Sequence, residues 1–276
     1  MPHPLLEPKI DCHLHLLDPQ RFPYGEGTPY RPEGQEIGTL HQMRAVFDAN
    51  GVTRALLVQP SSGYGTDNSA MLDAIQRSGM DWRGIAVVGP DVTHDQLAAL
   101  KAGGVAGVAY NLPFHPAGYY KAFAHVTEML VDLDLVLDIQ FEGDGIFEAL
   151  ELLGNAPVRL AIDHCGRPDL SAGRDSAAFR ALLALADRAP DTVIKLSGHH
   201  KFAPFPWPFE TAAPFVADLL AAYTPDRCVW GSDWPFLRVP ERVDYGPLLT
   251  LAAQSLPDDA AREKVFRRTA ERMFWG

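Results

Sequence analysis

The chain has 276 residues, of which 47% are hydrophobic, with a formal net charge of −11 and a pI of about 5.3. This length and apolar content are sufficient for a large core, so we expect residues 1–276 to form a single domain. The acidic balance argues against nucleic acid or an anionic membrane as a partner, although a few local cations could still bind an anionic substrate.

Targeting and redox signals are weak in this sequence. Met1–Pro4 lacks the basic region and apolar run of a signal peptide, and no apolar run reaches the ~18 residues needed to span a bilayer. Cys12, Cys165 and Cys228 are widely spaced and form no CxxC pair. We therefore expect a cytoplasmic protein with reduced thiols, whose oligomeric state the sequence leaves open.

Strands and helices alternate along most of the chain. The first strand, at 9–16, precedes a loop at 18–38 that is rich in Pro, Gly and Tyr and is expected to act as a lid or substrate-contact loop. Further strands are predicted at 55–59, 84–88, 104–111, 136–141, 159–164, 192–197 and 228–233, and helices at 39–50, 68–78, 95–102, 121–132, 146–153, 176–188, 213–223, 247–255 and 258–274. This order predicts an α/β protein with a single (β/α)8 TIM-type barrel and an extra C-terminal helix.

The first strand carries a His-x-His pair. Strict alternation would place Cys12 on an apolar face packed by helices and Asp11, His13 and His15 on the opposite face. Two imidazoles side by side suit either a metal ion or a carbonyl oxygen that needs two donors. The same pair also occurs on ordinary exposed strands, so it is only a starting hypothesis.

Polar residues also mark the ends of later strands. The sixth strand ends at His164 and the eighth at Asp233, and parallel strands of a barrel present their carboxyl ends at one face. We therefore expect His13, His15, His164 and Asp233 to converge in an active site. Other residues that follow strand ends are candidates for substrate contact: Ser61, Ser62, Tyr64, Asn111, Gln140, Arg167, His199 and Lys201.

Two groups among these candidates have competing interpretations. Ser61, Ser62 and Tyr64 lie in a segment that could simply be a turn, and the pair His199-His200 could be structural rather than functional. Cys12 and Cys165 are interpreted as core residues rather than nucleophiles. The chain contains no Gly-x-Ser-x-Gly sequence, so a serine hydrolase finds no support.

Three motifs in this order resemble the amidohydrolase superfamily. They are Asp11-Cys12-His13-Leu14-His15, Ile162-Asp163-His164-Cys165-Gly166-Arg167-Pro168 and Trp230-Gly231-Ser232-Asp233-Trp234-Pro235. Together they are most similar to the branch of the 2-pyrone-4,6-dicarboxylate lactonases, which includes sugar lactonases and lactone isomerases. The resemblance extends over nearly the whole chain and implies a hydrolase that opens a lactone ring in aromatic or sugar-acid catabolism.

The sequence departs from the metal-rich members of that superfamily. Its fourth strand ends without Lys or Glu, and its fifth offers Gln140, a poor metal ligand. A binuclear centre is therefore not expected, and a reaction without a cofactor is favoured. One divalent ion, zinc or manganese, on His13, His15, His164 and Asp233 remains the alternative.

A second departure concerns the substrate. Ala109 stands where the pyrone dicarboxylate enzymes carry an Arg that grips a carboxylate, whereas Arg167 and Lys201 remain. A lactone with fewer carboxylates, or a sugar-acid lactone, is therefore as plausible a substrate as the pyrone dicarboxylate.

The resemblance implies a division of labour in the site. Asp233 would act as general base and then general acid, and the three histidines would polarise the carbonyl oxygen. Two alternatives share this site: a metal-dependent amidohydrolase or decarboxylase, and a lactone isomerase in which no water adds to the product.

Overall fold

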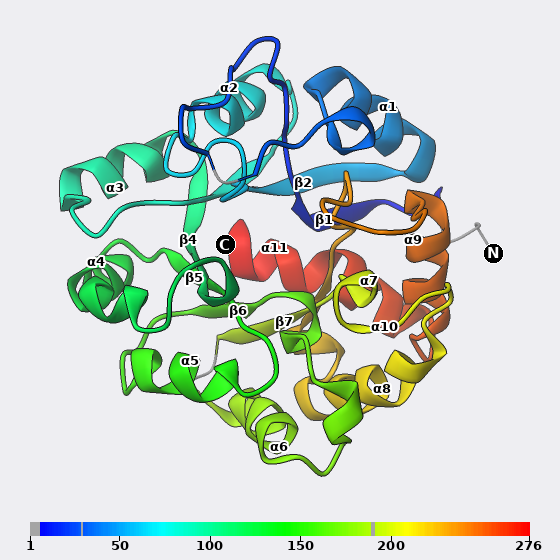
Figure 1. Cartoon of the computed structure of the whole chain (residues 1–276). Helices are drawn as coiled ribbons and strands as arrows, with labels where there is room; N and C mark the ends of the chain where they lie inside the picture. Colours follow the sequence, from blue (N-terminus) through cyan, green and yellow to red (C-terminus); the bar gives the residue numbers. More distant parts are fainter. Residues whose placement is uncertain (1–5, 29, 189–190) are drawn as a thin grey trace.

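The computed structural model describes residues 6–28, 30–188 and 191–276, so Met1–Pro4 lie outside the described residues. Eight parallel strands form one sheet in sequential order, β1 to β8, and the helices surround it (Figure 1). The segment after β8 returns to β1, since Asp233 N donates to His13 O at 2.7 Å and His15 N donates to Trp234 O at 2.8 Å. The predicted (β/α)8 barrel is confirmed.

Each predicted strand is present, with shifts of a few residues at the ends. The strands are β1 (Lys9–Leu14), β2 (Val52–Val58), β3 (Arg83–Ala86), β4 (Val105–Asn111), β5 (Val136–Gln140), β6 (Leu160–Ile162), β7 (Thr192–Leu196) and β8 (Cys228–Trp230). The last three are shorter than predicted because the chain leaves the sheet before the polar residues that build the cavity.

The predicted helices are also present. They are α1 (Leu40–Asn50), α2 (Ser69–Arg77), α3 (His94–Ala102), α4 (Ala124–Asp132), α5 (Gly145–Leu153), α6 (Ala177–Ala184), α8 (Ala213–Tyr223), α9 (Tyr245–Gln254), α10 (Asp259–Glu263) and α11 (Thr269–Phe274), with a π-helical turn at Lys264–Arg268 between the last two. A short helix after β7, α7 (His199–Phe202), was not predicted. No helix in the described ranges is long and apolar enough to cross a membrane.

Local signals explain where these helices begin and end. Thr39 caps α1 through a reciprocal pair of hydrogen bonds with Gln42, and Gly51 ends it with a left-handed φ of 67°. Thr93 and Gln96 repeat the same capping pattern at the start of α3. Such caps satisfy backbone groups that would otherwise lack partners at helix termini.

One apolar cluster fills the barrel interior, and the C-terminal helix α11 closes its amino end. Figure 1 shows α11 crossing the centre of the ring of strands. Arg159, just before β6, donates to the carbonyl of Met273 at 2.8 Å. The cluster consists of Ile10, Cys12, Leu56, Val58, Ile85, Val136, Ala161, Val193, Val229, Ala270, Met273 and Phe274. The opposite, carboxyl end of the barrel is left free for a site.

The alternation predicted for β1 is wrong at its centre. The register steps from Asp11 opposite Ala55 to Leu14 opposite Leu57, so β1 has one residue more than β2 over this interval. This bulge re-aims the side chains. Cys12 lies in the interior rather than against the helices, and the carboxylate of Asp11 turns away from the mouth to accept from Ser232 N at 2.9 Å.

Candidate active site

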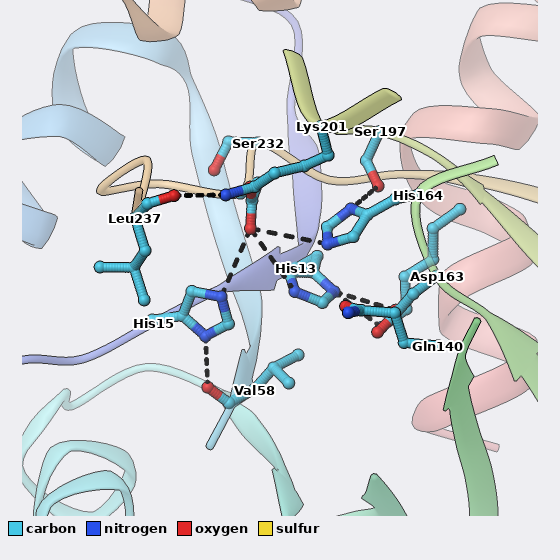
Figure 2. A network of polar contacts seen from close by, with 12 residues as sticks. His13, His15, Val58, Gln140, Asp163, His164, Ser197, Lys201, Ser232 and Leu237 are labelled. Atoms are coloured by element: carbon cyan, nitrogen blue, oxygen red, sulfur yellow. Dashed lines mark hydrogen bonds and ion pairs between the residues drawn. The ribbon is translucent and has the colours of Figure 1, made fainter. Parts of the chain in front are cut away.

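A cavity of about 390 Å³ lies at the carboxyl ends of the strands. The four residues predicted to converge line it together: His13, His15, His164 and Asp233. Figure 2 shows the three imidazoles turned toward one another, with His13 and His15 from β1 and its extension and His164 from the turn after β6. These residues are far apart in the sequence, and they meet because the carboxyl ends of parallel strands lie at one face of the barrel.

Asp233 stands at the centre of this cluster, and its two carboxylate oxygens have different partners. Oδ1 lies 3.3 Å from Nε2 of His15 and 3.7 Å from Nε2 of both His13 and His164. Oδ2 accepts a hydrogen bond from His200 Nε2 at 2.8 Å and lies 3.2 Å from Lys201 Nζ. Burial raises the pKa of a carboxyl, but the Lys201 ammonium and the other groups around Asp233 outweigh that effect and hold its pKa well below the usual range.

Hydrogen bonds at Nδ1 determine what two of the imidazoles present to Asp233. His15 Nδ1 lies 2.8 Å from the carbonyl oxygen of Val58, which can only accept, so Nδ1 carries the hydrogen. His13 Nδ1 lies 3.0 Å from a carboxylate oxygen of Asp163, which accepts, and 3.2 Å from the Lys195 ammonium, which donates; the shorter contact to the carboxylate favours a hydrogen on Nδ1. Burial lowers the pKa of His13 to about 4, so this ring is neutral at pH 7. With the hydrogen on Nδ1, each of these two rings in its uncharged form presents an Nε2 lone pair to the cavity.

His164 differs from the other two because its Nδ1 partner is a hydroxyl, Ser197 Oγ, at 3.1 Å. A hydroxyl can donate or accept, so neutral His164 can present either N–H or a lone pair at Nε2. Burial and the nearby His13 hold the pKa of His164 well below its usual value. This is the imidazole best able to donate to a substrate oxygen while remaining uncharged.

The backbone turn after β6 gives His164 its direction. His164 and Cys165 have left-handed φ values of 48° and 57°, which residues with a Cβ adopt rarely. Gly198 faces this turn, and a Cβ at that position would lie 2.4 Å from His164 Nδ1. The close packing of Gly198 on the ring therefore fixes where the imidazole lies.

A buried cluster of charged residues, Lys195, Asp138 and Asp163, contacts His13. Lys195 Nζ lies 2.8 Å from an oxygen of Asp138 and 2.9 Å from one of Asp163, and Asp163 in turn binds His13. Burial lowers the pKa of a lysine, but the two carboxylates outweigh that effect and raise the pKa of Lys195 above its usual value. Burial and the neighbouring Asp163 raise the pKa of Asp138 to about 7. The roles of Asp163 and Lys195 were missed, although Asp163 directly follows β6, Lys195 lies on β7, and each alternates with outward apolar residues.

The ligand chemistry of this cluster fits one divalent cation. The ligand atoms of His13, His15 and Asp233 all lie within 4.8 Å of one another, as do those of His13, Asp163 and His164. Both sets include His13. Neutral imidazole nitrogens and a carboxylate oxygen are the ligands that zinc prefers among nitrogen and oxygen donors. The hydrogen bonds at Nδ1 of His13 and His15 are the outer contacts that usually orient such ligands.

The predicted substrate contacts divide into two groups. Six line the cavity: Ser61, Ser62, Asn111, Gln140, Arg167 and Lys201. Tyr64 and His199 do not. The Tyr64 hydroxyl accepts from Asp18 N at 3.0 Å, and His199 is buried beside Phe202.

His200, Glu142 and Arg238 lie at the site and were not among the predicted contacts. His200, and not the predicted His199, binds Asp233. The sequence signal that could have identified it is the second histidine of the pair His199-His200. Glu142 and Arg238 also line the cavity. No described residue of the loop 18–38 lines the cavity; Tyr30 and Glu36 of this loop contact Arg238.

Known proteins resemble this chain over nearly its whole length. A family model described as amidohydrolase matches residues 10–275. The 4-sulfomuconolactone hydrolase of Rhizobium radiobacter is 34% identical over 96% of this chain and 89% of its own length. The D-galactarolactone isomerase of Agrobacterium fabrum is 27% identical over 96% of this chain and 90% of its own.

The solved structures agree with this relationship. A probable 2-pyrone-4,6-dicarboxylic acid hydrolase from Acinetobacter baumannii, solved with citric acid bound, has a TM-score of 0.86 and 25% identity. The match covers 97% of this chain and 99% of that one. This chain therefore belongs to the amidohydrolase family, and the resemblance predicted from its three motifs is confirmed.

Proposed function

We propose that this amidohydrolase adds water to the ring ester of an anionic lactone, with Asp233 as the general base. The observation that supports this most strongly is the position of Asp233, whose Oδ1 faces three imidazole Nε2 atoms in the cavity while Oδ2 is held by His200 and Lys201. The relatives named as hydrolases of sulfomuconolactone and pyrone dicarboxylate support a lactone as substrate. The proposed base, the imidazoles that would polarise the carbonyl and a cavity for the lactone ring would then lie together.

In this reaction Asp233 moves one proton. Its Oδ1 accepts a proton from water as the water oxygen bonds to the lactone carbonyl carbon. The bond between that carbon and the ring oxygen then breaks, and the protonated Asp233 returns the proton to the departing alkoxide or enolate. The hydrogen bond from His200 and the Lys201 ammonium hold the other oxygen, so Oδ1 stays directed at the reacting groups.

The three imidazoles are proposed to polarise the carbonyl, and their roles differ. His164 can donate Nε2–H to the carbonyl oxygen while neutral, because Ser197 can donate to its Nδ1. His13 and His15 could donate there only as charged rings, because their Nδ1 hydrogens are committed to Asp163 and Val58. The resemblance implies that all three imidazoles donate to the carbonyl oxygen. The hydrogen bonds at Nδ1 support this role better for His164 than for His13 or His15.

A second candidate is the same hydrolysis with one divalent ion in the site. The position of His13 and His15 Nε2 beside the Asp233 carboxylate favours it, because lone pairs on these nitrogens and a carboxylate would repel one another unless a cation lay between them. His13, His15 and Asp233 would hold the ion, zinc or manganese. When bound, it would supply Lewis-acid polarisation of the carbonyl.

Metal analysis separates these two candidates. Purified protein is assayed for bound metal by mass spectrometry, and its melting temperature is measured with and without a chelator. About one ion per chain, with a lower melting temperature after chelation, supports the ion-dependent form. Less than a tenth of an ion per chain, with an unchanged melting temperature and full activity, supports hydrolysis without a metal.

The base assignment is tested with Asp233→Asn, which keeps the shape of the side chain and removes its basicity. Turnover of lactones from aromatic degradation and of sugar-acid lactones should fall at least ~10²-fold, the lower end of what general acid–base catalysis contributes. Asp169→Asn, an exposed carboxylate on the loop after β6, serves as the matched control and should keep full activity. Full turnover by Asp233→Asn with a native circular dichroism spectrum would show that the base is another group.

Isomerisation is a separate outcome of the same site, and a relative named D-galactarolactone isomerase makes it a real alternative. In that reaction Asp233 would shuttle a proton without adding water. The mass of the product decides, since hydrolysis adds one water molecule and isomerisation adds none.

A further inference from the structure

We propose that Arg238 binds the anionic group of the substrate and thereby selects lactones with one negative group directed toward the loop after β8. This inference rests on the proposed lactone hydrolysis and deepens it. It concerns a residue outside the three motifs, and it starts from a comparison of the cations that line the cavity.

Among the described residues, three Lys or Arg side chains line the cavity, and two of them already have carboxylate partners. Arg167 forms an ion pair with Glu142, and Lys201 lies 3.2 Å from Asp233 while also donating to the carbonyl of Leu237 at 2.5 Å. Within the described ranges, Arg238 forms no salt bridge, and its side chain is exposed. Its guanidinium is therefore the cavity cation most able to take a new anionic partner.

Contacts with two other residues hold Arg238 in its position. Its backbone N–H donates to Glu36 Oε1 at 2.6 Å, and the other oxygen of Glu36 accepts from the Tyr30 hydroxyl. The guanidinium carbon lies 4.2 Å from the centre of the Tyr30 ring, a cation–π contact that holds the guanidinium over that ring. Two contacts from the loop 18–38 thus hold Arg238 at the cavity.

The backbone around Arg238 is held in an unfavourable conformation. Asp233, Phe236 and Arg238 have φ values of 63°, 67° and 54°, in the left-handed region that residues with a Cβ adopt rarely. Such conformations persist where surrounding contacts impose them, and they gather at functional sites. Here one strained segment carries both the proposed base and the free guanidinium.

The opposite wall indicates how many anionic groups the substrate has. β4 lies across the ring of strands from β8. The residues of β4 and of the turn after it that line the cavity are all uncharged: Ala109, Tyr110, Asn111, Pro113 and Phe114. A lactone bound near Asp233 would place its ring toward this neutral wall and its anionic group toward Arg238. A planar fork of N–H donors suits a carboxylate or a sulfonate equally, so the inference names the shared chemistry.

The test compares Arg238→Met with Arg242→Met on two substrates. Arg242 is on the same loop, pairs with Asp244 and lines a different cavity, so it controls for loss of a loop arginine. The substrates are a carboxylated lactone that the wild type opens and the matching primary amide, which has the same ring without the charge.

Arg238→Met should lower kcat/KM for the carboxylated lactone ~10–100-fold, mainly through KM, the loss typical of one hydrogen bond to a charged group. Its kcat/KM for the amide should change less than ~3-fold. Arg242→Met should match the wild type on both. Full activity of Arg238→Met on the carboxylated lactone, or equal losses on both substrates, would overturn the assignment.

A binding measurement separates this inference from the proposed function. Isothermal titration with citrate should show ~10-fold weaker binding to Arg238→Met than to Arg242→Met or wild type. If no lactone is opened by the wild type but citrate still discriminates between the variants, ring opening fails and the anion contact stands. If the wild type binds citrate no better than Arg238→Met, the contact is refuted.

Discussion

Replacement of Lys195 by Met tests whether the charge cluster under His13 is a structural requirement. Lys195 is fully buried and lies 2.8 Å from Asp138 and 2.9 Å from Asp163, both of them buried. Met has a similar length and no charge. The substitution therefore removes the cation and leaves two carboxyl groups facing each other inside the barrel.

The cost follows from burial rather than distance. Removing one partner of a buried ion pair costs ~3–5 kcal/mol, because the remaining charge has neither water nor a counter-ion. Lys264 and Asp226 provide the matched control, since their ion pair is also 2.8 Å long but 41% and 63% of the two side chains are exposed. Lys264→Met should cost ~0–1 kcal/mol, the range of solvent-exposed pairs.

The assay is urea unfolding followed by tryptophan fluorescence and by circular dichroism, with both variants measured at pH 7. A third variant, Lys195→Met with Asp138→Asn, removes one charge of each sign. It should recover ~1–2 kcal/mol relative to Lys195→Met, within the range of coupling between neighbouring groups. Equal free energies of unfolding for Lys195→Met and Lys264→Met would refute the reasoning, because burial would then make no difference to the pair.

Three further predictions concern other parts of the molecule. Gly198→Ala should lower turnover ~10²-fold with a native spectrum, because a Cβ would displace His164, whereas Gly34→Ala, at a similar φ with open space around it, should leave turnover unchanged. Burial lowers the pKa of His199 to about 4, so its contribution to stability is present above pH ~6.5 and is lost as the pH falls toward 4; His199→Gln should reduce the loss of unfolding free energy between pH 7 and 4 by ~3 kcal/mol in urea titrations. Tyr245→Phe removes a 2.9 Å hydrogen bond to a buried carboxylate of β1 and should cost ~1–3 kcal/mol in the same assay, and no change would show that water replaces it.

The roles within His199-His200 depended on a short helix that no pattern indicated. α7 begins after Gly198, whose φ is 64°, and successive side chains on a helix point about 100° apart. His200 therefore reaches Asp233, and His199 packs beside Phe202. A pair of adjacent histidines is visible in the sequence, but the one that reaches the site is determined by the turn that precedes them.

Arg238 illustrates a second limit. In the sequence it is one arginine in a loop with Arg242 close by, and neither is part of a motif. Its distinction arises from contacts with Tyr30 and Glu36, about 200 positions away, and from its place at the cavity. Loop arginines carry no periodic signal, so their partners appear only once the chain is folded.

The sequence by itself determined the barrel and the convergence of His13, His15, His164 and Asp233. Local periodicity predicts the order of strands and helices, and parallel strand direction then brings the strand ends to one face. Tertiary structure alone decided what each group presents there. The bulge in β1 turned Asp11 away, Val58 and Asp163 assigned the hydrogens of two imidazoles, and Lys195 was placed beneath His13. These outcomes depend on contacts between segments that are distant in the sequence, which residue order does not encode locally.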